Sequence, residues 1–102
     1  MSKFGEIIDQ EFPVLLSFNA YRNTNTVDMH EVLKEVSHAV RNKGKVIKID
    51  VEKNQRLAQA LRVKVLPTLV LYKKGEMIWR KSGVENSETL TALMQQHLQE
   101  EL

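Results

Sequence analysis

The chain has 102 residues, of which 42% are hydrophobic and 27% charged, and this composition predicts one globular domain over residues 1–102. It has no cysteine, which excludes disulfides, thiolate metal sites and iron–sulfur clusters. A formal net charge of +2 is too small to indicate nucleic-acid binding. No apolar run approaches the about 20 residues of a membrane span, and no signal pattern opens the chain. We therefore expect a cytoplasmic protein with no cofactor and with neither nucleic acid nor membrane as partner.

The hydrophobic pattern predicts elements in the order helix, strand, helix, strand, helix, strand, strand, helix. Apolar residues at every third or fourth position indicate the helices, and short alternating or continuous apolar runs indicate the strands. A crossover helix predicts that the first two strands pair in parallel, and Lys74-Gly75 predicts a tight turn between the last two. In chain order, the expected elements span residues 3–10, 14–19, 28–41, 45–51, 54–61, 68–72, 77–82 and 87–98.

Polar residues and glycine predict where two of the helices begin and end. Thr26 or Asp28 is expected to cap the start of the second helix, and Gly44 to follow its end. Ser87 is expected to cap the last helix. Trp79, on the last strand, is expected to pack under that helix.

Two segments resemble the thioredoxin family. Residues 65–76, Val-Leu-Pro-Thr-Leu-Val-Leu-Tyr-Lys-Lys-Gly-Glu, resemble the cis-proline strand and hairpin, and residues 14–20, Val-Leu-Leu-Ser-Phe-Asn-Ala, resemble the strand that leads to the redox cysteines. The resemblance implies an α/β fold of thioredoxin type, with a four-stranded mixed sheet flanked by helices on both faces. It also implies the strand order 45–51, 14–19, 68–72, 77–82. We expect the family's first edge strand to be missing, because the first predicted helix begins almost at Met1.

The positions that carry thiol chemistry in the family hold other residues here. The resemblance implies that Ser17 stands in place of a buried aspartate, Val46 in place of its lysine partner and Asn19 in place of a tryptophan. Because dithiol–disulfide exchange needs a thiolate, we expect a redox-inactive protein that is not an enzyme. The positions of the degenerate Cys-x-x-Cys motif are Asn23, Thr24, Asn25 and Thr26.

The resemblance also implies a peptide-binding surface. In the family, a cis peptide bond before the motif proline, here Pro67, leaves the preceding backbone groups able to pair with a partner segment. On this interpretation the chain is a chaperone-like or adaptor-like module that binds a protein or an extended peptide. The alternative is that Pro67 only shapes the edge of the sheet. The candidate binding residues are Tyr21, Arg22, Leu66, Pro67, Gly83 and Val84.

Two further functions stay open. Residues 23–26 could begin a helix whose N–H groups bind an anion, as in a small thiol-free enzyme, although these residue types are also ordinary helix caps. The strand at residues 45–51 lies at an open edge that could pair with another chain. Lys45 and Lys48 are expected to discourage such pairing, which favours a monomer or a weak dimer. His30 and His38 predict a solvated helix surface and no metal site.

Overall fold

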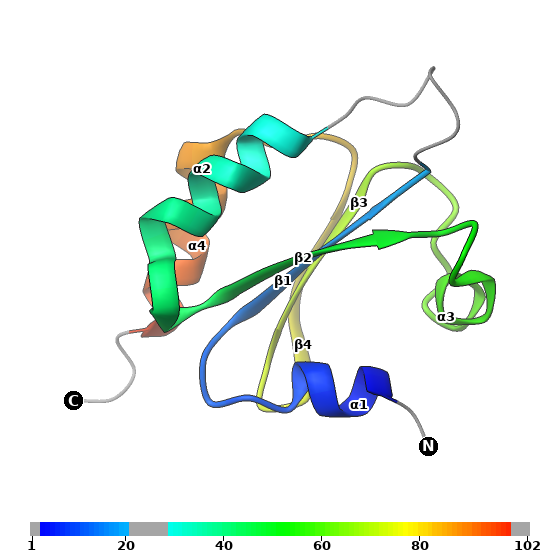
Figure 1. Cartoon of the computed structure of the whole chain (residues 1–102), viewed down its shortest axis with the longest axis horizontal. Coiled ribbons are helices and arrows are strands. Elements are labelled where there is room, and N and C mark those ends of the chain that lie inside the picture. The colour runs from blue at the N-terminus through cyan, green and yellow to red at the C-terminus, as the bar shows by residue number, and fades with distance from the viewer. Residues whose placement is uncertain (1–2, 21–28, 99–102) are drawn as a thin grey trace.

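The structure is a computed structural model that describes residues 3–20 and 29–98. Apart from one short 3-10 helix, the observed element order matches the predicted one; half of the element ends agree with the predicted ones, and the other half differ by one or two residues (Figure 1). The elements are α1 (Lys3–Ile8), β1 (Val14–Asn19), α2 (His30–Val40), the 3-10 helix η1 (Arg41–Lys43), β2 (Lys45–Asp50), α3 (Gln55–Ala60), β3 (Thr68–Lys73), β4 (Glu76–Ser82) and α4 (Ser87–Leu98).

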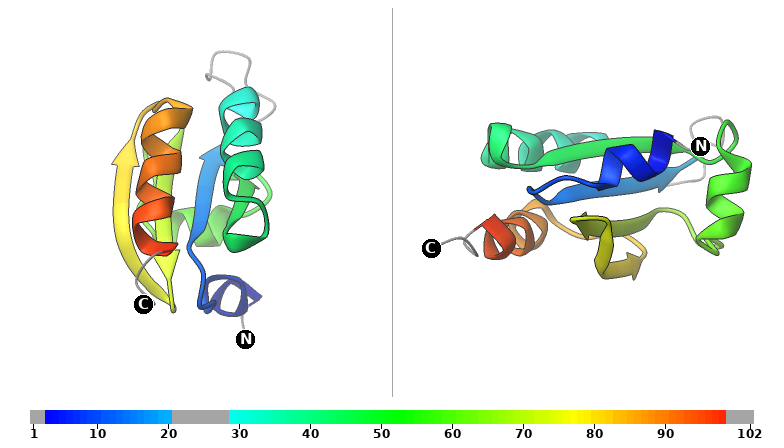
Figure 2. Two further views of the ribbon diagram at one scale, coloured as in Figure 1. Left: turned by 90° about the vertical axis from the view of Figure 1, so that its left-hand side faces the viewer. Right: turned by 90° about the horizontal axis from the view of Figure 1, so that it is seen from below.

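The four strands form one mixed sheet in the order β2-β1-β3-β4, which confirms the order implied by the resemblance. β1 pairs with β2 in parallel, and β3 pairs antiparallel with both β1 and β4. Both central strands are buried along their whole length, because helices cover the sheet on both faces. In Figure 2, α2 and α4 lie together over one face.

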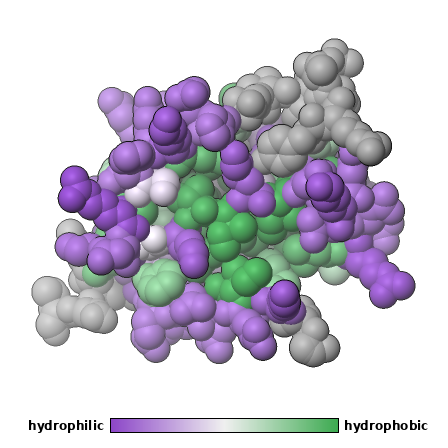
Figure 3. Space-filling view, in the orientation of Figure 1, coloured by the Kyte–Doolittle hydropathy of each residue, from purple (hydrophilic) through white to green (hydrophobic). Residues whose placement is uncertain are grey.

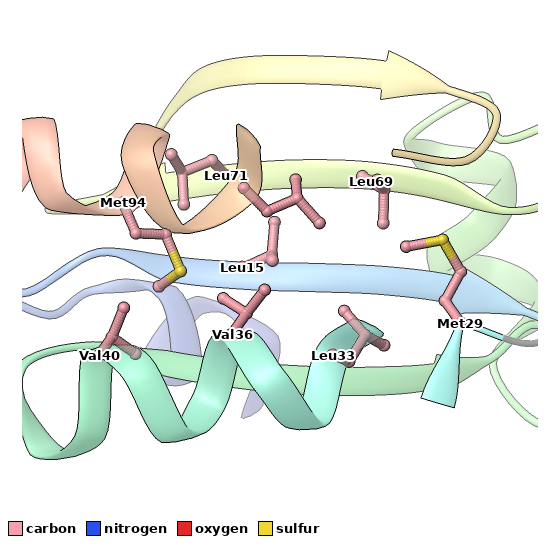
Figure 4. Packing of buried hydrophobic residues seen from close by; sticks show 9 residues of the cluster. Leu15, Met29, Leu33, Val36, Val40, Leu69, Leu71 and Met94 are labelled. Atoms are coloured by element: carbon pink, nitrogen blue, oxygen red, sulfur yellow. The ribbon is translucent and has the colours of Figure 1, made fainter. Parts of the chain in front are cut away.

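Two hydrophobic clusters fill the two layers. Leu15 from β1 and Leu69 and Leu71 from β3 point toward α2 and α4, where Val36 and Met94 pack against them (Figure 4). The cluster on the opposite face receives residues from α1 and α3, and its strand residues include Leu16, Phe18 and Val70. The alternation of adjacent residues between the two clusters follows from the two-residue period of a strand.

An irregularity in β4 brings a large aromatic residue onto the α4 side of the sheet. The pairing register shifts between Leu71, which pairs with Trp79, and Tyr72, which pairs with Met77. Ile78 and Trp79, although adjacent in sequence, therefore both pack against the cluster that contains Leu71 and the α4 residues. The prediction that Trp79 packs under the last helix is confirmed.

The β3–β4 hairpin holds the end of α1. The backbone N–H groups of Lys74 and Gly75 donate to the carbonyl oxygens of Gln10 and Ile8, at 2.9 and 3.0 Å. The rings of Phe4 and Tyr72 meet edge to face, with centroids 5.6 Å apart. The turn thus satisfies carbonyl groups at the end of a short helix that would otherwise need water.

The predicted helix caps were wrong in detail. Met29, and not Thr26 or Asp28, occupies the N-cap position of α2, and the side chain of Met29 makes no capping hydrogen bond. Asn86 caps α4, since its Oδ1 accepts from the backbone N–H of Thr89 at 2.8 Å, while Ser87 is the first helical residue. A serine and an asparagine side by side are both good caps, and the direction in which the chain enters the helix decides between them.

Gly44 follows the end of α2 as predicted, but for a reason other than backbone freedom. Its φ of −160° is extended backbone that any residue adopts, and the left-handed position is Arg41, with a φ of 52°. A Cβ at Gly44 would lie 2.9 Å from Met94 Cε and 3.3 Å from the carbonyl oxygen of Pro13. Close packing therefore favours glycine at this point.

Candidate functional site

Two of the predicted binding segments meet at one end of the sheet. The backbone N–H of Gly83 donates to the carbonyl oxygen of Pro67 at 2.8 Å, directly beyond the paired residues Thr68 and Ser82. Phe18, near the carboxyl end of β1, pairs with Thr68 on the other side. The Leu66–Pro67 peptide bond is cis, as the resemblance implies. We use the name Pro67 surface for Val65, Leu66, Pro67, Gly83 and Val84 together.

Exposed apolar side chains flank this hydrogen bond. Val65 is 52% exposed and Val84 is 48% exposed, and among the described residues the other exposed large hydrophobic residue is Met77. Leu66 is half-buried and packs against the α1 and α3 cluster, and Pro67 is buried. The side chains that a partner could touch are therefore mainly the two valines. The sequence analysis did not include Val65 among the candidate binding residues. The feature that could have identified it is an apolar residue shortly before a buried strand.

The backbone of Leu66 can accept a partner. Within residues 3–20 and 29–98 the N–H and C=O groups of Leu66 make no hydrogen bond. Its neighbours are already paired, since the carbonyl oxygen of Val65 accepts from the hydroxyl of Thr68 and that of Pro67 accepts from Gly83. An extended peptide can pair with such a donor and acceptor and rest its side chains on the adjoining valines.

Gly83 keeps the surface open but is a poor position for mutation. A Cβ built on Gly83 would meet no atom within 4 Å, so the space above it is empty. Its φ of +109° is nevertheless a conformation that residues with a side chain rarely adopt. A bulky side chain at Gly83 would therefore strain the backbone as well as occupy the open space above it.

Glu85 holds the turn that presents Val84. Its carboxylate accepts from Lys81 Nζ at 3.0 Å and from the backbone N–H of Asn86 at 3.1 Å. These hydrogen bonds lower the pKa of the Glu85 carboxyl below its usual value, the larger effect coming from Lys81. The Lys81–Glu85 pair spans Gly83 and Val84, so it positions the exposed valine.

Two positions at which this chain departs from the family, those of the aspartate and the tryptophan, hold a neutral polar pair. The hydroxyl of Ser17 donates to Oδ1 of Asn19 at 2.7 Å, and both residues are buried. Val46, at the position of the family's lysine, is half-buried on β2 opposite Leu15. Since Ser17 and Asn19 do not titrate near neutral pH, they supply no general acid or base.

Several predicted site residues lie outside the described residues. Tyr21 and Arg22, the aromatic and cationic residues of the predicted peptide-binding surface, are two of them. The others are the positions of the degenerate motif, which were also the alternative anion-binding site: Asn23, Thr24, Asn25 and Thr26. Among the residues that are described, no group of three or more His, Asp or Glu side chains could hold a metal ion. No helix in the described ranges is long and apolar enough to cross a membrane.

Comparisons with known proteins agree with this geometry. The thioredoxin family model matches residues 1–96. The thioredoxin-like protein slr0233 of Synechocystis sp. is 34% identical over 83 residues, which are 81% of this chain and 79% of that protein. Chloroplastic thioredoxin Y of Oryza sativa is 35% identical over 83 residues, but the chain spans only 49% of its length. The solved structure of a mutant thioredoxin from Halobacterium salinarum matches with a TM-score of 0.77 at 27% identity, over 97% of this chain and 86% of that one.

Proposed function

The chain belongs to the thioredoxin family, and since it has no cysteine, we propose that it is a redox-inactive member that binds extended protein segments. Thiol–disulfide exchange by a cysteine pair is chemically excluded in this chain. What the fold retains is the surface beside the motif proline, and the proposed role is that of a chaperone-like or adaptor-like module.

The observation that carries the proposal is the composition of the Pro67 surface. The backbone donor and acceptor of Leu66, unpaired within the described part of the chain, adjoin the exposed Val65 in sequence, and the Gly83–Pro67 hydrogen bond ties the segment of the exposed Val84 to the next residue. A bound strand would pair with Leu66 through its main chain and place alternate side chains against the two valines. Such a site favours extended apolar segments and has little further sequence specificity.

Replacement of both exposed valines tests this proposal. Carboxymethylated α-lactalbumin, which stays unfolded, serves as the probe, and its binding is followed by fluorescence anisotropy. The double variant Val65→Glu/Val84→Glu should bind about tenfold more weakly or worse, because charged groups replace the apolar contacts. Both positions are exposed, so the variant should keep the thermal stability of the parent.

Met77→Glu is the matched control, because Met77 is 42% exposed but lies on β4, beside the hairpin turn and away from Gly83. It should bind the probe as the parent does. Equal binding by the parent and the double variant would contradict the proposal. So would an equal loss in Met77→Glu, since the effect would then come from surface hydrophobicity in general.

A further inference from the structure

β2 is an open edge of the sheet. It pairs with β1 on one side, and no segment among residues 3–20 and 29–98 pairs with its outer side. β2 crosses the front of the view in Figure 1, and Figure 3 shows hydrophobic residues gathered across the centre of that face with hydrophilic residues around them. The apolar residues that β2 itself contributes, Val46, Ile47 and Ile49, are only half-buried. An edge with these properties can accept another strand.

A basic cleft runs beside this edge. A cavity of about 250 Å³ lies between α2 and β2, and its described lining contains four basic side chains, one serine and two apolar residues but no acidic group. The α2 residues that contribute to it recur at helical spacing on one face of the helix. The lining residues are His30, Leu33, Lys34, Ser37, His38, Val46 and Lys48.

Lys48 joins the cleft to the strand edge. On β2, Val46 and Lys48 lie on the face covered by α2, while Ile47 and Ile49 belong to the opposite face. Lys48 Nζ lies 2.8 Å from His30 Nδ1 on α2. Both residues of this contact line the cleft, so the Lys48 side chain extends from β2 toward α2 along the cleft wall. A strand added to β2 would therefore pass directly beside a positive charge.

We propose that the β2 edge binds an extended segment in which acidic and apolar residues alternate. The backbone of the segment pairs with β2, its acidic side chains enter the basic cleft, and its apolar side chains cover Ile47 and Ile49. Alternate side chains of a strand point to opposite faces, so one segment satisfies both requirements only with this alternation. Asp50 lies on the α2 face at the end of β2, and its negative charge would repel an acidic side chain of the bound segment. The acidic residues of the segment should therefore lie beside β2 before Asp50.

Charge makes a second copy of this chain a less favourable occupant. Antiparallel pairing of two β2 strands around a two-fold axis normal to the sheet would place both α2 helices on the same side. The two basic clefts would then adjoin, with Lys34 and Lys48 of one copy near those of the other. Like charges at close range oppose this arrangement, whereas an acidic strand places opposite charges beside Lys34 and Lys48.

The test uses a short acetylated peptide that alternates Val and Glu, with binding measured by calorimetry and mapped by backbone amide NMR. We expect shifts at β2 and α2 and slower hydrogen exchange of β2 amides. The same peptide with Lys in place of Glu should bind at least about tenfold more weakly. A version with N-methylated backbone amides should not bind, because it cannot pair with the edge.

Variants of the protein locate the site. Lys34→Gln/Lys48→Gln changes two exposed side chains and should weaken the acidic peptide roughly tenfold, whereas Lys64→Gln, an exposed lysine next to the Pro67 surface, should not. No binding, or undiminished binding of the N-methylated peptide, would overturn the proposal. Shifts confined to the Pro67 surface, or a tight dimer through β2 in sedimentation, would overturn it as well. The proposal does not depend on the function of the Pro67 surface.

Discussion

At Ser17 and Asn19 two buried polar side chains form a hydrogen bond with each other inside the sheet. Neither side chain titrates near neutral pH, and the hydrogen bond of 2.7 Å between them lies among fully packed apolar residues. A buried carboxylate at residue 17 would face a desolvation cost that a serine avoids. The pair thus adds no buried charge to β1.

Glu85 gives a pH-dependent prediction at the same scale. Its pKa is lowered in the folded protein by the hydrogen bonds from Lys81 and Asn86. A carboxyl pKa that is lower in the folded state than in the unfolded state stabilises the fold at pH values above the unfolded-state pKa. This contribution is lost as the pH falls through the folded-state pKa. Glu85→Gln should therefore reduce the free energy of unfolding at neutral pH, and the difference from the parent should vanish in acid. Denaturant titrations across the acidic range measure it.

Glu35→Gln is the control for this experiment, because Glu35 is an exposed carboxylate on α2. Its stability difference from the parent should stay small at every pH. If the difference in free energy of unfolding between Glu85→Gln and the parent persisted unchanged below the pH range of carboxyl titration, the charge of Glu85 would not be what stabilises the turn.

The β3–β4 hairpin shows how a local conformation is set at the scale of an element. Lys74 and Gly75 both have positive φ, 56° and 81°, which is the geometry of a type I′ turn. Glycine suits this turn, but lysine does not, and the ion pair of Lys74 with Glu11 at 3.8 Å is exposed and contributes little. The hydrogen bond from Lys74 N–H to Gln10 involves only the backbone.

Lys74→Asn should therefore stabilise the protein by about 0.5–1 kcal/mol, because asparagine tolerates positive φ better than lysine does. Lys64→Asn, at an exposed loop residue without positive φ, should have no such benefit. Thermal and urea denaturation of both variants measure the effect. A loss of stability in Lys74→Asn would mean that the lysine side chain, and not its backbone conformation, matters at this turn.

At the scale of the whole molecule, the fold presents two candidate surfaces and no thiol. The Pro67 surface lies where β1 ends and β3 begins, and the β2 edge lies on the outer side of the sheet. Two surfaces on one small domain fit a module that joins partners, and each can be changed by substitution of exposed residues alone.

The purified chain should not reduce insulin disulfides in the presence of dithiothreitol above the rate of dithiothreitol alone. The physical reason is that the reaction passes through a mixed disulfide, and no residue of the chain can form one. A cysteine-containing thioredoxin serves as the positive control. Turnover that follows the protein through purification would contradict the prediction.

The sequence by itself determined the elements and the loss of thiol chemistry, and its resemblance to the thioredoxin family implied the strand order. Apolar periodicity indicates which side of a segment is buried, and the motif around Pro67 is a local run of residues. Both can therefore be recognised without knowledge of the packing. The absence of cysteine is likewise a property of composition.

Only the tertiary structure decided which side chains are available to partners. The exposure of Val65, the pairing of Ser17 with Asn19 and the cap at Asn86 depend on how neighbouring segments approach. His30 and Lys48 are 18 residues apart, yet they lie 2.8 Å from each other because α2 packs over β2. Such contacts join distant parts of the chain, and their geometry is set by the fit of whole elements, which no local pattern encodes.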